Sequence, residues 1–286
     1  MSIQSATFRI PGTTANLGPG YDCLGVALGL SNLVTVSRAS VASTTTMDPA
    51  GPMAAEAASL FFETAKIMPF PFDWNIEGEV PPSRGMGSSV TVRLGLLAGL
   101  NALADSPLSR KDLFELCAGL EGHPDNAAPA AFGGFTVAGG SELARFEVSS
   151  TLAFVLLIPN FEISTPQARK VLPQNLERLS AVASCANACR ITAAFASQNY
   201  KLLRGSFADG LHQPFREALI PFLPDVIRAG ENAGALGGFL SGSGSTICCV
   251  SLEDPERVAQ AMKEAARTDV TVVITKADNE GAVQVS

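Results

Sequence analysis

The chain has 286 residues, of which 47% are hydrophobic and 16% are charged, and its formal net charge is −7. This length supports one large or two modest globular domains with a full hydrophobic core. The acidic balance argues against nucleic acid and against an anionic membrane as the main partner.

Targeting and cysteine patterns point to a reduced cytoplasm. The N-terminus carries no basic stretch followed by an apolar one, and no uncharged apolar run of about 18 residues occurs, so we expect neither a secretion signal nor a membrane span. The six cysteines include no CxxC pair. Cys185 and Cys189 would share a helical face, but the chain has only two histidines, so a zinc site is not expected.

The first predicted elements surround a polar loop. Residues 6–10 are expected to form a strand, which Pro11 and Gly12 should end. The segment that follows contains Asn16 and Asp22 among many glycines, prolines and threonines. A loop of this composition is more often functional than decorative, and the alternative is a loop whose polar side chains satisfy their own backbone.

A glycine-rich turn that leads into a helix is the centre of the prediction. Strands are expected over residues 33–37 and 74–78, with a helix over 54–67 between them. After two prolines, the sequence SRGMGSS leads into an apolar helix expected over residues 90–103. Glycines allow close approach of a ligand, and the first N–H groups of a helix are unpaired, so such a turn suits phosphate. The alternative is an ordinary serine-capped helix.

Two familiar nucleotide-binding motifs do not fit this turn. No lysine follows Gly87, so it is not a Walker-type loop. Val90 stands where the third glycine of the dinucleotide fingerprint would be, which disfavours an oxidoreductase.

A cluster of polar residues follows the next helix, expected over residues 109–120. Glu121, His123, Asp125 and Asn126 lie within six residues, ahead of a segment expected to be an apolar, glycine-bearing strand. By themselves these side chains could form a solvated turn.

The second half is predicted to alternate strands and helices, with a domain boundary near residue 150. The expected elements are a buried strand over 151–159, a largely helical stretch over 176–203, a glycine-rich turn and strand over 234–250, an amphipathic helix over 254–267 and a strand over 270–275.

Several segments together resemble the GHMP small-molecule kinases. The glycine-rich turn resembles their P-x-x-x-G-L-G-S-S-A phosphate loop, with Met86 for leucine and with Val90 and Thr91 in place of the usual small pair. PGTTANLGPGYDCLG and EGHPDNAAPAAFGG match two further motifs in the wording of the homoserine kinase family. GALGGFLSGSGST resembles the third GHMP motif, which should support the phosphate loop from behind.

Two arginines are singled out only by this resemblance. STPQARKVLP and LHQPFREALIP resemble family segments that supply Arg169 and Arg216, which alone would be taken as surface charges. Arginine forks bind carboxylates in a bidentate manner, so two converging arginines would make an α-carboxylate site.

The resemblance implies an α+β GHMP kinase fold. Residues 1–150 would form a ribosomal-protein-S5-like α/β domain and residues 151–286 a ferredoxin-like α+β domain. It also implies an enzyme that uses ATP and Mg²⁺ to phosphorylate the side-chain hydroxyl of L-homoserine, a step in threonine biosynthesis. The alternatives are a GHMP kinase for another amino-acid alcohol such as threonine, and a non-catalytic metabolite-binding regulator. A homodimer is left open.

The resemblance also assigns roles to the site residues. Asp22 would face the substrate ammonium, Arg169 and Arg216 its carboxylate, and Asn16 would line the substrate pocket near the reacting hydroxyl. Mg²⁺ would lie between Glu121 and a serine hydroxyl. The residues expected to hold the phosphates are Arg84, Gly85, Met86, Gly87, Ser88 and Ser89, with Ser89, or its neighbour Ser88, as the serine at the metal.

The proton acceptor is the open point of the mechanism. His123 and Asn126 are expected near the reacting hydroxyl, with Glu121 completing the catalytic set. Several GHMP kinases have an aspartate at the position of Asn126, and an amide cannot accept a proton. The hypothesis is therefore direct attack without a strong base, with His123 as the alternative base.

Overall fold

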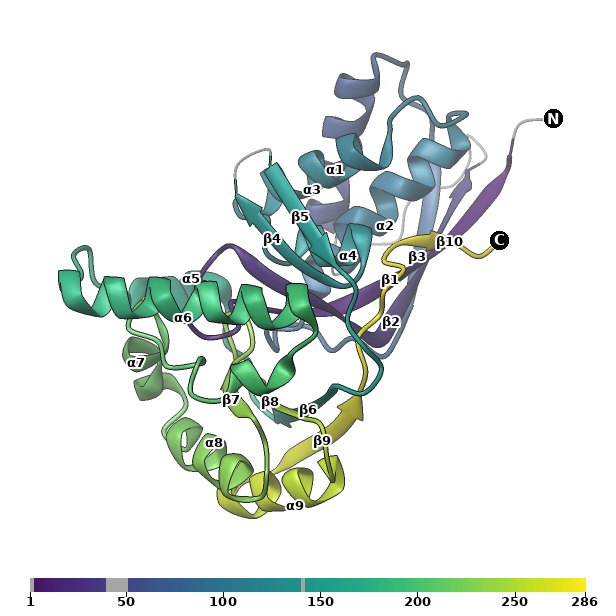
Figure 1. Ribbon diagram of the computed structural model, residues 1–286. Helices are drawn as coiled ribbons and strands as arrows, with labels where there is room; N and C mark the ends of the chain where they lie inside the picture. The colour runs from purple at the N-terminus through teal and green to yellow at the C-terminus, as the bar shows by residue number, and fades with distance from the viewer. Residues whose placement is uncertain (1–2, 40–50, 140–141) are drawn as a thin grey trace.

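Two antiparallel sheets organise the computed structural model, which describes residues 3–39, 51–139 and 142–286 (Figure 1). Within these residues the first sheet has six strands in the order β10-β1-β2-β4-β5, with β3 also paired to β2. The second has four strands in the order β7-β8-β6-β9. Helices cover both sheets, and the expected α+β class is confirmed.

The first sheet is built around a long hairpin. β1 (Ser5–Ala15) and β2 (Leu24–Arg38) pair antiparallel, with a bulge between Pro11 and Thr13. Both strands are longer than the expected 6–10 and 33–37, because the bulge lets β1 continue past the proline that was expected to end it. The hairpin therefore presents residues 16–23 as a loop at its end. The other strands of this sheet are β3 (Phe72–Gly78), β4 (Phe135–Gly139), β5 (Glu142–Phe146) and β10 (Val283–Gln284).

The helices of the first half pack on this sheet around α2. Their bounds are α1 (Gly51–Ala65), α2 (Ser88–Leu103), α3 (Arg110–Glu121) and α4 (Ala127–Phe132). α2 is buried along most of its length. It lies close to β2 because Gly95 and Gly99 have no Cβ, and a Cβ at these positions would overlap with Val34 or Val36. This burial fixes the start of α2, where the glycine-rich turn ends.

The prediction for the segment after Asn126 was wrong, because a helix precedes the strand there. α4 occupies the alanine-rich sequence AAPAAF, and its proline lies in the first turn, where a missing N–H breaks no helical hydrogen bond. Gly133 and Gly134, both with φ +72°, then turn the chain into β4. The polar cluster therefore lies between two helices, α3 and α4.

The central strand β6 of the second sheet packs against side chains on both faces. Along β6 (Ala153–Pro159), Phe154 and Leu156 face a core shared with β2, while Val155 and Leu157 face the helices α8 and α9. The other strands are β7 (Gly237–Leu240), β8 (Ile247–Ser251) and β9 (Val270–Thr275). The helices of this half are α5 (Thr165–Lys170), α6 (Arg178–Ser197), η1 (Tyr200–Leu203), α7 (Gln213–Arg216), η2 (Glu217–Leu219), α8 (Leu223–Asn232) and α9 (Pro255–Ala266).

After β9 the chain returns to the first sheet. Figure 1 shows the yellow C-terminal segment running back along the purple first strand, where β10 pairs with β1. Arg9 of β1 forms ion pairs with Asp278 and Glu280 of this segment. The two ends of the chain are thus held on the same sheet.

α6 is long and apolar enough to cross a membrane by length and composition, and 22% of its most apolar window is buried. Its apolar character comes largely from alanine, and Arg190 lies in its second half.

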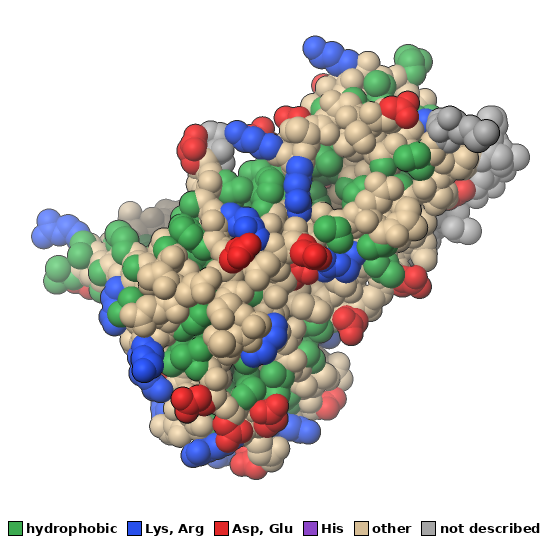
Figure 2. Space-filling model, turned by 45° about the vertical axis from the view of Figure 1, so that its right-hand side comes forward, with side chains coloured by type: hydrophobic (Ala, Val, Ile, Leu, Met, Phe, Trp, Pro, Cys, Tyr) green, Lys and Arg blue, Asp and Glu red, His purple; other side chains and the backbone are tan. Residues whose placement is uncertain are grey.

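Figure 2 shows acidic and basic side chains interspersed over the face in view, with no extended area of one sign.

Candidate active site

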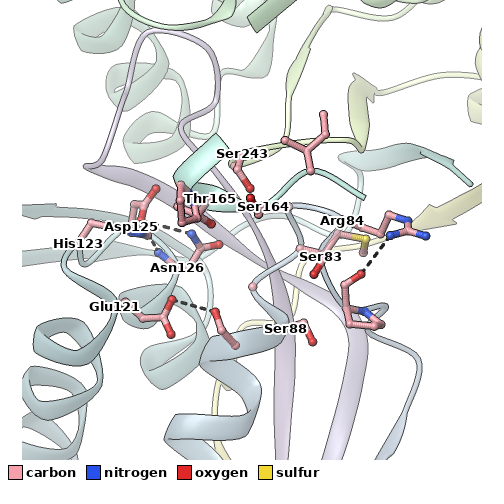
Figure 3. A pocket seen from close by; sticks show the side chains of 18 of the residues that line it. Ser83, Arg84, Ser88, Glu121, His123, Asp125, Asn126, Ser164, Thr165 and Ser243 are labelled. Atoms are coloured by element: carbon pink, nitrogen blue, oxygen red, sulfur yellow. Dashed lines mark hydrogen bonds and ion pairs between the residues drawn. The ribbon is translucent and has the colours of Figure 1, made fainter. Parts of the chain in front are cut away.

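A cavity of about 470 Å³ lies where the polar loops of both halves meet (Figure 3). It is bordered by the β1–β2 loop, the glycine-rich turn, the polar cluster after α3, and segments of the second half around α5, α7 and the β7–β8 loop. Every residue given a role in the site from the sequence lines it: Asn16, Asp22, Arg84, Gly85, Met86, Gly87, Ser88, Ser89, Glu121, His123, Asn126, Arg169 and Arg216.

The glycine-rich turn delivers an uncapped helix end to the cavity. Gly85 and Gly87 have φ of +71° and +69°, and a Cβ on either would overlap with Ser241 O or Thr13 Oγ1. α2 begins at Ser88, and no side chain caps its N-terminus. The alternative of a serine-capped helix is therefore wrong, and the first N–H groups of α2 are left for an anion.

The third glycine-rich segment supports this turn from behind, as expected. Ser241 Oγ donates to Gly85 O at 2.7 Å, and Thr246 N donates to Arg84 O at 3.2 Å. Ser243, which the sequence did not single out by itself, lines the cavity from the same segment.

Ser89, in the first turn of α2, contacts Glu121 at the end of α3. Ser89 Oγ donates to Glu121 Oε2 at 2.8 Å, and Arg93 Nη1 donates to Glu121 Oε1 at 2.7 Å. The side chain of Glu121 is 10% exposed. Arg93 was missed from the sequence, although it is the charged residue one helical turn after Ser89 in an otherwise apolar helix.

The arginine of the turn has other partners. Arg84 Nε donates to Pro159 O at 3.1 Å, and its Nη1 lies 3.3 Å from Glu162 Oε1. In Figure 3 its side chain points away from Glu121 and Asn126. The guanidinium thus holds the turn against the second half of the chain.

The polar cluster after α3 is internally connected. His123 Nδ1 lies 2.6 Å from Asp125 Oδ1, and Asn126 Nδ2 donates to the same oxygen at 3.3 Å. Thr13 Oγ1 donates to Asn126 Oδ1 at 2.7 Å. The amide of Asn126 is therefore oriented: its oxygen accepts from Thr13 of β1, and its NH₂ group faces Asp125. Thr13 and Asp125 were not assigned roles from the sequence.

The pKa of His123 is raised above its usual value. Burial of the ring opposes the charged form, but the hydrogen bond and the charge of Asp125, with the charge of Asp22, outweigh it. Since Nδ1 faces Asp125, the neutral ring would carry its free lone pair on Nε2.

Asp22 and Arg169 are paired with each other. Arg169 Nη2 donates to Oδ1 and Oδ2 of Asp22 at 2.9 and 3.1 Å, and its Nη1 donates to the hydroxyl of Tyr21 at 2.8 Å. The guanidinium carbons of Arg169 and Arg216 lie 5.6 and 5.4 Å from the centroid of the Tyr21 ring. The guanidinium groups of the two arginines therefore both lie close to the Tyr21 ring.

Arg216 is buried and held rigidly. Its guanidinium donates to Ala168 O and Gly242 O at 3.2 and 3.0 Å, and its Nη1 lies 3.1 Å from Nδ1 of His212. Burial lowers the pKa of His212 to about 4, with the charge of Arg216 acting in the same direction and that of Asp209 opposing it, so the ring is neutral at neutral pH and accepts this hydrogen bond. Its Nε2 donates to Gly18 O at 2.8 Å. His212 precedes Arg216 by four residues, a spacing that could have indicated the contact.

Asn16 joins two loops of the site. It has φ +70°, its Nδ2 donates to Gly242 O at 3.0 Å, and its Oδ1 accepts from Asp22 N at 2.9 Å. The side chain thereby fixes the backbone of Asp22 at the edge of the cavity.

Comparisons with known proteins agree with this geometry. The model of the GHMP kinase N-terminal domain matches residues 53–134, and that of the GHMP kinase C-terminal domain matches residues 191–268. These matches place the chain among the GHMP kinases. A homoserine kinase of Aquifex aeolicus is 35% identical over 96% of this chain and 97% of its own length, and one of Microchaete diplosiphon is 36% identical over 98% and 97%. The chain belongs to the homoserine kinase family.

Solved structures share the fold. The homoserine kinase of Cytophaga hutchinsonii matches with a TM-score of 0.89 at 24% identity, covering 99% of this chain and 98% of that one. A mevalonate kinase matches with a TM-score of 0.71 at 14% identity, covering 96% and 99%. The predicted GHMP kinase fold is confirmed.

Proposed function

We propose that this protein transfers the γ-phosphoryl group of ATP to the side-chain hydroxyl of L-homoserine, giving O-phospho-L-homoserine and ADP. The bond between the γ-phosphorus and its bridging oxygen breaks as the substrate oxygen bonds to phosphorus. One observation carries the proposal: a helix N-terminus suited to phosphate shares a cavity with one carboxylate and two arginines that complement an amino-acid zwitterion.

The triphosphate would lie on the backbone of Gly85 to Ser89, at the positive end of the α2 dipole. Mg²⁺ would be held by Ser89 and Glu121, whose oxygens already lie 2.8 Å apart. A hydroxyl and a carboxylate, with phosphate oxygens and water, suit the hard octahedral ion. Bound there, the ion would neutralise charge on the transferred phosphoryl group. Arg93 would hold the second oxygen of Glu121 and so fix the carboxylate.

The amino acid would bind at the other end of the cavity. Asp22 would receive the α-ammonium, and Arg169 and Arg216 the α-carboxylate. Asn16 supports this arrangement indirectly, because it fixes the backbone at Asp22. The fixed charges would thus orient the substrate hydroxyl toward the phosphate end.

The hydroxyl would attack without a strong base. Asn126 supports this reading because its oxygen already accepts from Thr13, so its NH₂ group is the part that can contact the substrate oxygen or the phosphoryl group. His123 Nε2 is the alternative acceptor of the hydroxyl proton. An increase in kcat of several-fold in Asn126→Asp, with a new pH limb typical of a carboxylate, would argue against the base-free route.

The division of the chain is also a proposal. A boundary near residue 150 is supported by β5 and β6 lying in different sheets, while the return of β10 to the first sheet adds the end of the chain to the N-terminal unit. We place the enzyme in the cytoplasm.

The deciding experiment is an ADP-release assay with Mg·ATP and, in turn, L-homoserine, L-threonine, L-serine and mevalonate. Turnover should be strongest on L-homoserine and abolished in Glu121→Ala. Stronger turnover on another alcohol would remove the substrate assignment and keep the kinase. ATP binding without any turnover would instead indicate a metabolite-binding regulator.

A further inference from the structure

The groups assigned to the two charges of the substrate are not free, because they bind each other. Both carboxylate oxygens of Asp22 accept from one nitrogen of Arg169, at 2.9 and 3.1 Å. The side chains of Arg169 and Asp22 are 39% and 31% exposed, so a ligand in the cavity can reach the pair from solvent. The pair therefore occupies the position that an amino acid would need.

The second arginine behaves differently. Arg216 is 2% exposed and is held by two backbone carbonyls and by His212. Within the described residues, no carboxylate lies within ion-pair distance of it. Arg216 is thus a fixed cation, whereas Arg169 is partly exposed and contacts Asp22 and Tyr21 through hydrogen bonds and the Tyr21 ring.

We propose, resting on the function proposed above, that the Asp22–Arg169 ion pair is a closed state that the substrate opens by charge exchange. The α-ammonium replaces Arg169 on Asp22, and the α-carboxylate replaces Asp22 on Arg169, so neither side chain is left without an opposite charge. This exchange makes the site selective for ligands that carry both charges.

A ligand with one charge cannot complete the exchange. A carboxylate that takes Arg169 leaves Asp22 unpaired, and an ammonium that takes Asp22 leaves Arg169 unpaired. Selectivity here comes from the penalty imposed on the wrong ligand as well as from contacts with the right one. Removing one member of the pair should therefore improve binding of the ligand that uses only the other member.

The test uses two analogues of L-homoserine that each lack one charge. 4-Hydroxybutanoate lacks the α-ammonium, and 3-aminopropan-1-ol lacks the α-carboxylate. Dissociation constants are measured by NMR titration of the full chain with each analogue and with L-homoserine. A partly exposed ion pair is worth little, so the expected gains are about two- to fivefold.

The expected pattern is an inversion between ligands. Asp22→Asn should bind 4-hydroxybutanoate about two- to fivefold more tightly than the wild type, and Arg169→Gln should do the same for 3-aminopropan-1-ol. Both variants should bind L-homoserine more weakly. If neither variant binds its analogue more tightly than the wild type does, the proposal is overturned.

A charge control separates exchange from general electrostatics. Arg216→Gln removes a positive charge that lies over the same Tyr21 ring but is not paired with Asp22. It should not tighten 3-aminopropan-1-ol, and a gain equal to that of Arg169→Gln would overturn the proposal. If Arg216→Gln does not fold, Arg84→Gln is the second control, because Arg84 lines the cavity and pairs with Glu162.

The exchange and the proposed activity can fail separately. Turnover of L-homoserine is assayed on the same wild-type sample. The inverted binding pattern without turnover would support the exchange and remove the activity. Turnover without the pattern would keep the activity and overturn the exchange, and a wild type that binds none of the three ligands would overturn both.

Discussion

The hydroxyl of Thr13 should contribute to catalysis indirectly, through its hydrogen bond to Asn126. Thr13 is fully buried, and its Oγ1 donates to Asn126 Oδ1 at 2.7 Å. Thr13→Val keeps the shape of the side chain and removes this donor. The side-chain carbonyl of Asn126, a residue that is 9% exposed, is then left facing a methyl group.

The magnitude follows from the loss of one buried donor. Leaving a buried acceptor without a partner costs about 1–3 kcal/mol, so Thr13→Val should lower the free energy of unfolding by about that amount. For a chain of this size, Tm should fall by about 2–4 °C for each kcal/mol. The Asn126 amide would no longer be oriented, and we expect kcat to fall about tenfold, which corresponds to about 1.4 kcal/mol.

Two measurements check this expectation. Chemical denaturation gives the change in stability, and steady-state kinetics with Mg·ATP and L-homoserine gives kcat and KM. Thr13→Ser is the matched control, since it keeps the hydroxyl and should retain most of kcat. Equal kcat values in Thr13→Val and the wild type, with the expected loss of stability, would refute a role for Thr13 in orienting Asn126.

Three further predictions concern backbone geometry and pH. Gly85→Ala should lower kcat/KM for ATP at least about tenfold, because alanine is strained at φ +71° and its Cβ would overlap with Ser241 O; Gly119→Ala, where a Cβ meets open space, should leave it unchanged. Since the pKa of His123 is raised, its ion pair with Asp125 stabilises the fold below about pH 6.5 and is lost as pH rises through the folded value. The stability difference between the wild type and His123→Gln, from urea melts, should therefore shrink as the pH rises above about 6.5; a constant difference would contradict this. For His212 the sign is opposite: its pKa of about 4 in the folded state means that the unfolded chain takes the proton first. Wild-type stability should fall from about pH 6.5 toward pH 4, and His212→Gln should flatten this slope; parallel curves would argue against a buried neutral ring.

The positions of the site loops could be predicted because each carries a local signal. Gly85 and Gly87 need a left-handed backbone, and the structure uses that freedom to bring the turn against Thr13 and Ser241. The polar cluster after α3 was recognised from its match to the EGHPDN wording of the homoserine kinase family, because by itself it could have formed a solvated turn. These signals come from short segments and do not depend on tertiary structure.

The partners of the predicted residues could not be found this way. Thr13 reaches Asn126, and Arg169 reaches Asp22, across more than a hundred residues, so no spacing rule connects them. The lengths of β1 and β2 were underestimated because the bulge that carries β1 past Pro11 is a property of strand pairing. α4 was missed because a six-residue alanine-rich segment has too little periodicity to be distinguished from a strand.

The pairing of β10 with β1 has a consequence for how the chain folds as it is made. Synthesis is slow compared with the folding of small units, so the N-terminal half has time to collapse before the second half exists. Its first strand nevertheless keeps one edge open until residues 278–284 have emerged, because Asp278 pairs with Arg9 and β10 pairs with β1 only then. Unpaired strand edges invite association with other chains. For most of its synthesis this protein therefore carries an exposed edge that the end of the second half is required to cover.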